Sequence, residues 1–159
     1  MSAFLALLRS DVRSHYPDLA PRVAALRAVA NISIWAAALF RIAGRNGAVG
    51  KVGRWWLMSW LGCDVGPGAT FGAGFRLPHP TGIVVGRGGA VGDRVVVYQN
   101  VTLGSDRLGR YPTLADDVVV YPGAVCVGDI ALADRTVVGA NCFLSRSTSI
   151  GEIVSGGRS

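Results

Sequence analysis

Two histidines, His15 and His79, are the only side chains of this 159-residue chain whose ordinary pKa lies close to neutrality. Two are too few for a three-histidine metal site within one chain. We interpret His15, which lies in a polar helical stretch, as a solvated residue. The three cysteines, Cys63, Cys126 and Cys142, are odd in number and lack Cys-x-x-Cys spacing. We therefore expect no metal, no disulfide framework and a reducing, cytoplasmic setting.

A six-residue repeat indicates the elements that must position His79. Every sixth residue is apolar from Val85 to Leu103, and again from Leu114 to Ile150. A period of six is typical of a parallel β-helix, in which short strands end in tight turns and three strands complete one circuit. The chain contains 22 glycines, about twice the usual share, which suits such turning. We therefore predict a mainly β domain over residues 63–159, after an N-terminal helical region over residues 1–62.

The repeat is interrupted between Leu103 and Leu114, which are eleven residues apart instead of twelve. The intervening segment is polar and contains glycine, so it predicts a loop extruded from the coil over residues 104–113. Loops on a rigid scaffold often carry functional residues.

Two segments resemble the signature of the serine acetyltransferases: HPTGIVVG at residues 79–86 and VYQNVTLG at residues 97–104. The resemblance covers roughly residues 30–150 and includes the helical approach from Ile34 to Ala43 and the segment Asp64–Thr70. These enzymes have a left-handed β-helix and use acetyl-CoA. The resemblance implies this fold, acetyl-CoA as co-substrate, a hydroxyl acceptor and a homotrimer with sites between neighbouring β-helices.

The resemblance also implies catalytic roles for two residues. His79 matches the family's general base and Asp64 matches the aspartate that orients it. Fifteen residues is nearly one 18-residue circuit, so Asp64 is expected to return close to His79. A base of this kind accepts the proton of the attacking hydroxyl, and the carboxylate stabilises the resulting imidazolium.

Ligand contacts are expected at five further positions. Arg110 matches the arginine associated with the substrate carboxylate, and Tyr111 stands where the family usually has a histidine, so both are substrate-binding candidates. For the cofactor we select Gly104, beside the extruded loop, with Arg135 and Arg146 as candidates for the phosphates of CoA.

Two departures from the family pattern affect the choice of acceptor. Pro78 replaces an aspartate that precedes the catalytic histidine, and Tyr111 replaces the loop histidine. Short proteins with a Leu-Pro-His-Pro segment resemble O-acetyltransferases of surface-polysaccharide assembly. We therefore rank a saccharide or polysaccharide precursor first as acceptor. Serine O-acetylation for cysteine biosynthesis is the alternative, and a non-catalytic β-helix scaffold is the third hypothesis.

The net charge of +6 lies entirely within residues 1–62, which carry eight basic and two acidic side chains. Helices are predicted over Phe4–His15, Val23–Arg45 and Lys51–Leu61, with all four tryptophans in the last two. Arginine and tryptophan together favour peripheral contact of residues 1–62 with the inner face of a membrane. In the alternative account, the tryptophans cap the first circuit of the β-helix. No nucleic-acid reading motif is present, so no nucleic-acid partner is expected.

Overall fold

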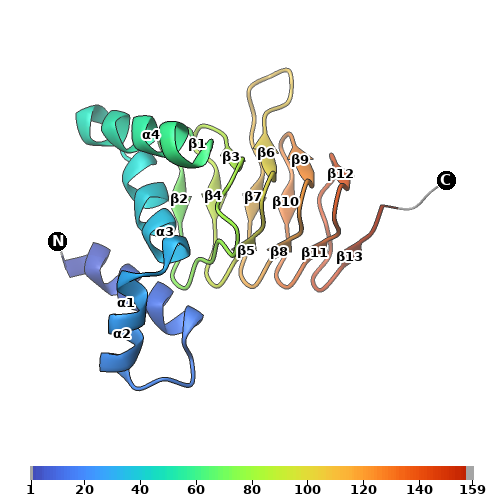
Figure 1. Ribbon diagram of the computed structural model, residues 1–159. Coiled ribbons are helices and arrows are strands. Elements are labelled where there is room, and N and C mark those ends of the chain that lie inside the picture. The colour runs from blue at the N-terminus through green and yellow to red at the C-terminus, as the bar shows by residue number, and fades with distance from the viewer. Residues whose placement is uncertain (1, 157–159) are drawn as a thin grey trace.

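A helical region precedes a β-helix in the computed structural model, which describes residues 2–156 (Figure 1). The helices are α1 (Ser2–His15), α2 (Pro21–Val29), α3 (Ile32–Ala43) and α4 (Gly47–Leu61). The last three residues of the predicted domain 63–159, and Met1, lie outside the described residues.

The prediction of one helix over Val23–Arg45 is wrong, because two helices, α2 and α3, occupy this stretch and are bent by 81° at the break. The first helix ends at its C-cap, Ala30, and Asn31 caps the second: its side-chain oxygen accepts a hydrogen bond from the Ser33 amide at 2.9 Å. Its amide nitrogen donates to the hydroxyl of Tyr16 at 2.8 Å, which fixes the bend against α1. Among residues 2–156, no single helix is long and apolar enough to cross a bilayer, although α2 and α3 together reach that length and composition.

Short strands follow one another around a three-sided prism, and all of their pairings are parallel. The first sheet has the order β1-β3-β6-β9-β12, the second β2-β4-β7-β10 and the third β5-β8-β11-β13. This arrangement confirms the predicted left-handed parallel β-helix. The strands are β1 (Asp64–Val65), β2 (Thr70–Phe71), β3 (Val84–Val85), β4 (Ala90–Val91), β5 (Val96–Val97), β6 (Thr102–Gly104), β7 (Thr113–Leu114), β8 (Val119–Val120), β9 (Val125–Val127), β10 (Ala131–Leu132), β11 (Val137–Val138), β12 (Phe143–Leu144) and β13 (Ile153–Val154).

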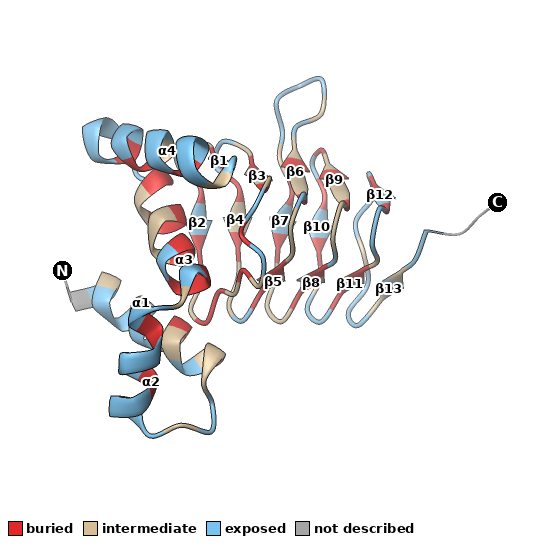
Figure 2. Cartoon of the chain, in the orientation of Figure 1, coloured by how far each residue is buried: buried red, intermediate tan, exposed pale blue. Residues whose placement is uncertain are grey.

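The core of the prism consists of the predicted six-residue repeat. From Val85 to Leu144 the apolar residue of every repeat is buried, and Figure 2 shows buried segments in red along the strands. Ile150, the last member, is exposed, because it lies in the final circuit near the end of the stack. Each buried side chain contributes roughly 1.5–3 kcal/mol of transfer free energy, so the stack itself stabilises the coil.

The circuits differ in length, and the additional residues form the loop between β6 and β7 and a longer corner in the first circuit. Val84 pairs with Thr102 eighteen residues later, whereas Thr102 pairs with Val125 after twenty-three residues, which include the loop between β6 and β7. The first circuit, from Asp64 to Val84, has twenty residues. Because Arg76 still bridges to Val96, its two additional residues lie between Arg76 and Val84. The corner that contains His79 is therefore longer than the corresponding corner of the next circuit.

Helix α3 covers the open end of the first circuit. Ala36, Ala37 and Phe40 are buried there, and the Phe40 ring contacts Phe71 edge-on with 5.7 Å between centroids. The account in which tryptophans cap this circuit is therefore wrong, because small residues and phenylalanine fill the space and the tryptophans remain exposed.

A buried ion pair fastens α1 to the same end. The Asp11 carboxylate accepts two hydrogen bonds from Nη2 of Arg41, at 2.7 and 2.9 Å, and one from Nε at 3.1 Å. Arg41 also donates to the backbone carbonyls of Phe71 and Gly72, and Asp11 accepts the Phe75 amide at 3.0 Å. Both side chains are almost fully buried. One carboxylate and one guanidinium thus connect two helices with the first circuit.

Charged residues line the edge between the second and third sheets. Successive circuits place Arg94, Asp117 and Arg135 there, each with a positive φ of 55–60°. Arg94 makes a two-point contact with Asp117, with Nε to Oδ1 at 2.6 Å and Nη2 to Oδ2 at 2.8 Å. The charges therefore alternate along the edge.

Candidate active site

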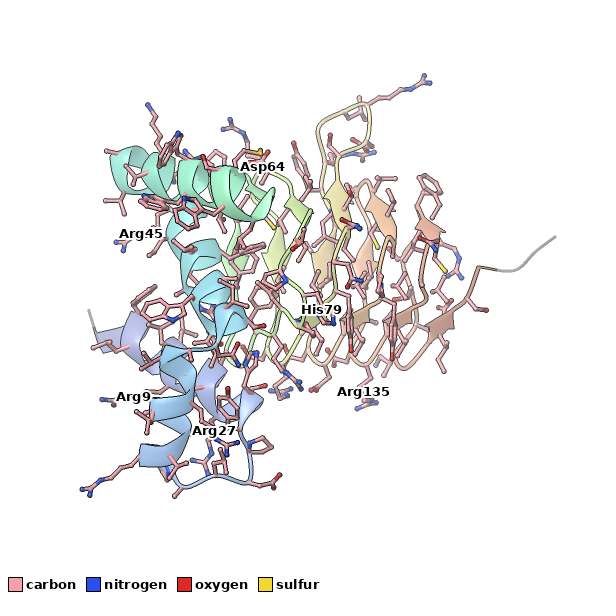
Figure 3. The ribbon with its side chains drawn as sticks, in the orientation of Figure 1. Arg9, Arg27, Arg45, Asp64, His79 and Arg135 are labelled. Carbon is pink, nitrogen blue, oxygen red and sulfur yellow. The ribbon has the colours of Figure 1, made fainter. Side chains whose placement is uncertain are left out.

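His79 lies on the outside of the prism, at the long corner between the third and first sheets (Figure 3). Its side chain is exposed, and within residues 2–156 the imidazole makes no hydrogen bond. The backbone turns tightly here, since the carbonyl of His79 accepts a hydrogen bond from the Thr81 amide at 2.8 Å. The corner thus presents an unengaged imidazole on a well-defined turn.

Three neighbouring elements hold this corner in place. Ser33 of α3 donates its hydroxyl to the Pro78 carbonyl at 3.3 Å. The Gly82 amide donates to the carbonyl of Leu61 at the end of α4, at 3.2 Å. The Asn100 amide, one circuit later, donates to the Thr81 carbonyl at 2.9 Å. The helices therefore position the corner as much as the β-helix does.

Asp64 begins β1 and is exposed, with its amide bonded to the carbonyl of Ile83 at 2.9 Å. Its neighbour Cys63 is buried and connects the two predicted catalytic segments, since its sulfur lies 3.6 Å from the Pro80 carbonyl and 3.4 Å from the Ile83 amide. Burial raises the pKa of the Cys63 thiol, which keeps it protonated as a weak donor. The backbones beside Asp64 and His79 are thus adjacent. Among the described residues, no hydrogen bond or ion pair joins the two side chains, so their direct contact stays a prediction.

Two tyrosines extend from His79 along the same edge. The Tyr98 ring lies 6.4 Å from the imidazole at 47°, and the Tyr121 ring stacks on Tyr98 at 5.1 Å and 6°. The sequence reasoning missed both residues. The signal was present, because the position after the buried apolar residue is usually small in this repeat, whereas it holds an aromatic ring at Tyr98 and Tyr121.

The loop residues Arg110 and Tyr111 lie at the other edge of the first sheet, between β6 and β7. Strand β3 of the first sheet separates His79 from Gly86, where the Tyr111 ring packs, so the two lie at opposite edges of this sheet. A Cβ on Gly86 would approach Tyr111 Cε1 to 1.9 Å, so the glycine makes room for the ring. A single chain therefore does not bring the loop residues to His79.

Arg110 is already engaged within its own chain. Its guanidinium contacts the Asp106 carboxylate at 2.7 Å and the Asp129 carboxylate at 3.1 Å, although half of its side chain is exposed. These carboxylates raise the pKa of Arg110. A substrate carboxylate at Arg110 would have to share or displace these partners.

The three cofactor candidates do not form one cluster. Gly104 and Arg146 lie at the edge between the first and second sheets, whereas Arg135 lies at the edge between the second and third. Arg146 is paired with Glu152 at 2.6 Å, and Arg135 projects from the prism on the opposite side from the loop (Figure 3). Their roles stay predictions.

His15 differs from the sequence interpretation. The interpretation as a solvated residue is wrong, because Nε2 is buried without a hydrogen-bond partner, while Nδ1 lies 2.9 Å from the Asp11 carbonyl. Burial lowers the pKa of His15. A hollow of about 480 Å³ between α1 and α2 is lined by Leu8, Val12 and Tyr16, among others, and contains none of the predicted site residues.

Comparisons with known proteins relate the chain to one group of enzymes. A plasmid-encoded serine acetyltransferase of Synechococcus elongatus is 40% identical over 106 residues, which cover 59% of this chain and 33% of that protein. The serine acetyltransferase of Mycobacterium tuberculosis is 38% identical over 98 residues, which cover 60% of this chain and 43% of that protein. No family model matches the chain. The chain thus spans less than half the length of these two relatives.

Solved structures extend the likeness over the whole chain. Serine acetyltransferase isoform 3 of Entamoeba histolytica, in complex with cysteine, superposes with a TM-score of 0.80 at 27% identity. The superposition covers 99% of this chain and 59% of that one. Helical region and β-helix therefore share the arrangement found in that protein.

These findings contradict the ranking of the acceptor and the closeness to polysaccharide O-acetyltransferases, because the similar proteins are serine acetyltransferases. The structure gives the physical reason. Tyr111 packs on Gly86, so its ring has a structural role within the chain. The departure of Tyr111 from the family pattern is therefore explained without a sugar acceptor. The chain resembles the serine acetyltransferases in sequence over more than half of its length and in fold over nearly all of it.

Proposed function

We propose that this protein is an acetyl-CoA-dependent O-acetyltransferase whose acceptor is L-serine. The observation that carries the proposal is the 40% identity to a serine acetyltransferase. In addition, the β-helix presents an exposed histidine at the corner of its first circuit that is two residues longer than the corresponding corner of the next circuit. The match covers 33% and 43% of the two relatives, so the activity is proposed for the part that this chain shares with them.

The proposed reaction needs one base at His79. The imidazole accepts the proton of the serine hydroxyl as its oxygen attacks the thioester carbonyl carbon. The tetrahedral adduct then collapses, the carbon–sulfur bond breaks, and the imidazolium returns the proton to the CoA sulfur. Asp64, in the segment beside His79, stabilises the positive charge. Backbone amides of the glycine-rich turns are available for the oxyanion.

The loop must come from a neighbouring copy, and we propose the trimer for this reason. Within one chain, His79 and the loop residues Arg110 and Tyr111 lie at opposite edges of the first sheet. A prism offers flat faces, whereas a ligand site needs concavity. Side-by-side prisms create a groove in which one chain's loop meets the next chain's histidine, with acetyl-CoA and serine bound between them.

Release of CoA thiol, followed with a thiol reagent, tests the reaction. Wild-type protein should release CoA with acetyl-CoA and L-serine but not with glycine, which has no hydroxyl. His79→Ala should lose about 10²–10⁴-fold in kcat, and Asp64→Asn should lose less. Asp18→Asn, an exposed carboxylate elsewhere, serves as the control and should match the wild type. Turnover with other hydroxyl compounds but not serine would reject the acceptor, and full activity of His79→Ala would reject the mechanism.

Mixing two variants tests the shared site. His79→Ala retains its loop, and Arg110→Ala retains its histidine. If both are inactive alone and sites form between copies, random mixed trimers should recover about a quarter of wild-type sites. No recovery after unfolding and refolding the two together would place each site within one chain.

A further inference from the structure

Helix α4 exposes large apolar side chains that its own packing does not use. Only Gly50, Gly53 and Leu57 are buried on this helix, which Figure 2 shows as exposed along most of its length. A Cβ on Gly53 would come within 2.9 Å of both the Ala43 amide and Ile42 Cγ2, so α4 packs on α3 through glycine. The exposed part of the helix surface, which we call the outer face of α4, carries Val49, Val52, Trp55, Trp56 and Trp60.

The arrangement inverts that of an ordinary helix on a globular protein, whose large apolar residues face the core. Trp55 is 60% exposed and Trp60 72% exposed. The tryptophans contact one another, with 5.4 Å between the ring centroids of Trp55 and Trp56 and again between those of Trp56 and Trp60. A contiguous aromatic patch of this kind marks an interaction surface.

Charge indicates what covers the patch. From Leu19 to Cys63 the chain has no acidic residue. Lys51 on α4 and Arg45, just before the helix, are exposed, and Arg54 donates to the Ala43 carbonyl at 2.7 Å rather than to a carboxylate. Two copies joined through this face would bring like charges together, which disfavours association. A cationic surface with tryptophans fits an anionic lipid bilayer, where tryptophan prefers the headgroup level.

We infer that the outer face of α4, with Arg45 and Lys51, docks on an anionic membrane surface. The helix lies flat in the headgroup layer with its tryptophans inserted, and the β-helix projects away from the bilayer. At 15 residues α4 is shorter than the ~20 residues that span a bilayer, in keeping with this in-plane position.

Vesicle binding tests the inference with purified full-length protein. Vesicles of phosphatidylcholine alone and with about 30% phosphatidylglycerol, to imitate a negatively charged leaflet, are compared by flotation. All four tryptophans lie in the helical region, so their fluorescence should shift to the blue on binding. We expect binding to the anionic vesicles only, lost at high salt.

Paired variants separate the apolar and the charged parts of the surface. W55S/W56S/W60S should weaken binding at least about tenfold. R45Q/K51Q should weaken it by about fivefold for each charge. The matched controls Phe143→Ser and Arg87→Gln, an exposed aromatic and an exposed cation on the β-helix, should bind as the wild type does. Circular dichroism verifies that each variant is folded.

Several outcomes overturn the inference. These are absence of wild-type binding at low salt, equal binding to neutral vesicles, and tryptophan variants that bind unchanged. A fourth is a fall in the mass of the assembly in solution when the tryptophans are replaced, because this result would mean that a second copy covers the face in the wild type. Acetyl transfer, measured without vesicles, should be unchanged in these variants, so this test stands apart from that of the proposed reaction.

Discussion

Removing both members of the Asp11–Arg41 pair should destabilise the fold by much less than the sum of the two single removals. Asp11→Ala leaves the Arg41 guanidinium buried without a carboxylate and the Phe75 amide without its acceptor. Uncompensated burial of one charge destabilises by about 3–5 kcal/mol. With a urea m-value of roughly 2 kcal/mol/M, the unfolding midpoint should fall by about 1.5–2.5 M.

The double variant separates the attraction between the two charges from the penalty of burying them. Burial raises the pKa of Asp11 while the Arg41 guanidinium opposes that rise, so desolvation is the larger influence on the carboxyl. Replacing both charges with apolar residues, in D11L/R41M, removes the desolvation penalty and leaves the carbonyls of Phe71 and Gly72 without donors and the Phe75 amide without its acceptor. We expect the double variant to lose about 2–4 kcal/mol, well below the sum of the two single losses.

Urea unfolding, followed by circular dichroism, is measured for the wild type, the two single variants and the double variant. Asp18→Ala, an exposed acid in the same region, is the control and should change stability by less than about 0.5 kcal/mol. Additive losses within about 0.5 kcal/mol would refute the reasoning, because they would mean that the two side chains do not interact.

Three further predictions concern His15, Tyr98 and Gly86. Burial lowers the pKa of His15, so between that folded pKa and the ordinary value of 6.5 the unfolded chain binds more protons. Stability should therefore fall as the pH drops through this window, and His15→Gln should flatten the dependence of the urea midpoint on pH. Tyr98→Ala should lower kcat/KM about tenfold by freeing the imidazole of His79, and Tyr98→Phe should restore it, since the ring makes the contact. Gly86→Ala should displace Tyr111 and speed tryptic cleavage of the loop, whereas unchanged digestion would show that the ring accommodates the methyl group.

The β-helix could be predicted from the sequence because its pattern is local and repeated. The apolar residue of each repeat is buried from Val85 to Leu103 and again from Leu114 to Leu144, as a period of six predicts. Even the long corner is visible as a change of phase, since Ile83 and Val85 are both buried two residues apart. A repeat tolerates such insertions at corners, because strand pairing resumes in the next circuit.

Features that depend on packing across the chain could not be predicted in this way. An apolar helix face normally indicates contact with a core, yet in α4 the glycines occupy the inner side and the tryptophans the outer. Arg110 resembles a free substrate ligand in sequence, but Asp129, nineteen residues away, contacts it through the fold of the loop. Likewise, nothing local to Tyr111 reveals that its ring fills the space above Gly86.

The alternating charges at the edge between the second and third sheets have a consequence for how the coil assembles. Circuits of a solenoid are similar enough that a strand can pair with the wrong neighbour while the chain folds. A chain that skipped one circuit would place Arg94 against Arg135, two cations, in place of the two-point contact between Arg94 and Asp117. Three charged side chains on the outer edge thus favour the correct order of the circuits. The buried apolar residues, which are similar in every circuit, do not distinguish one circuit from the next.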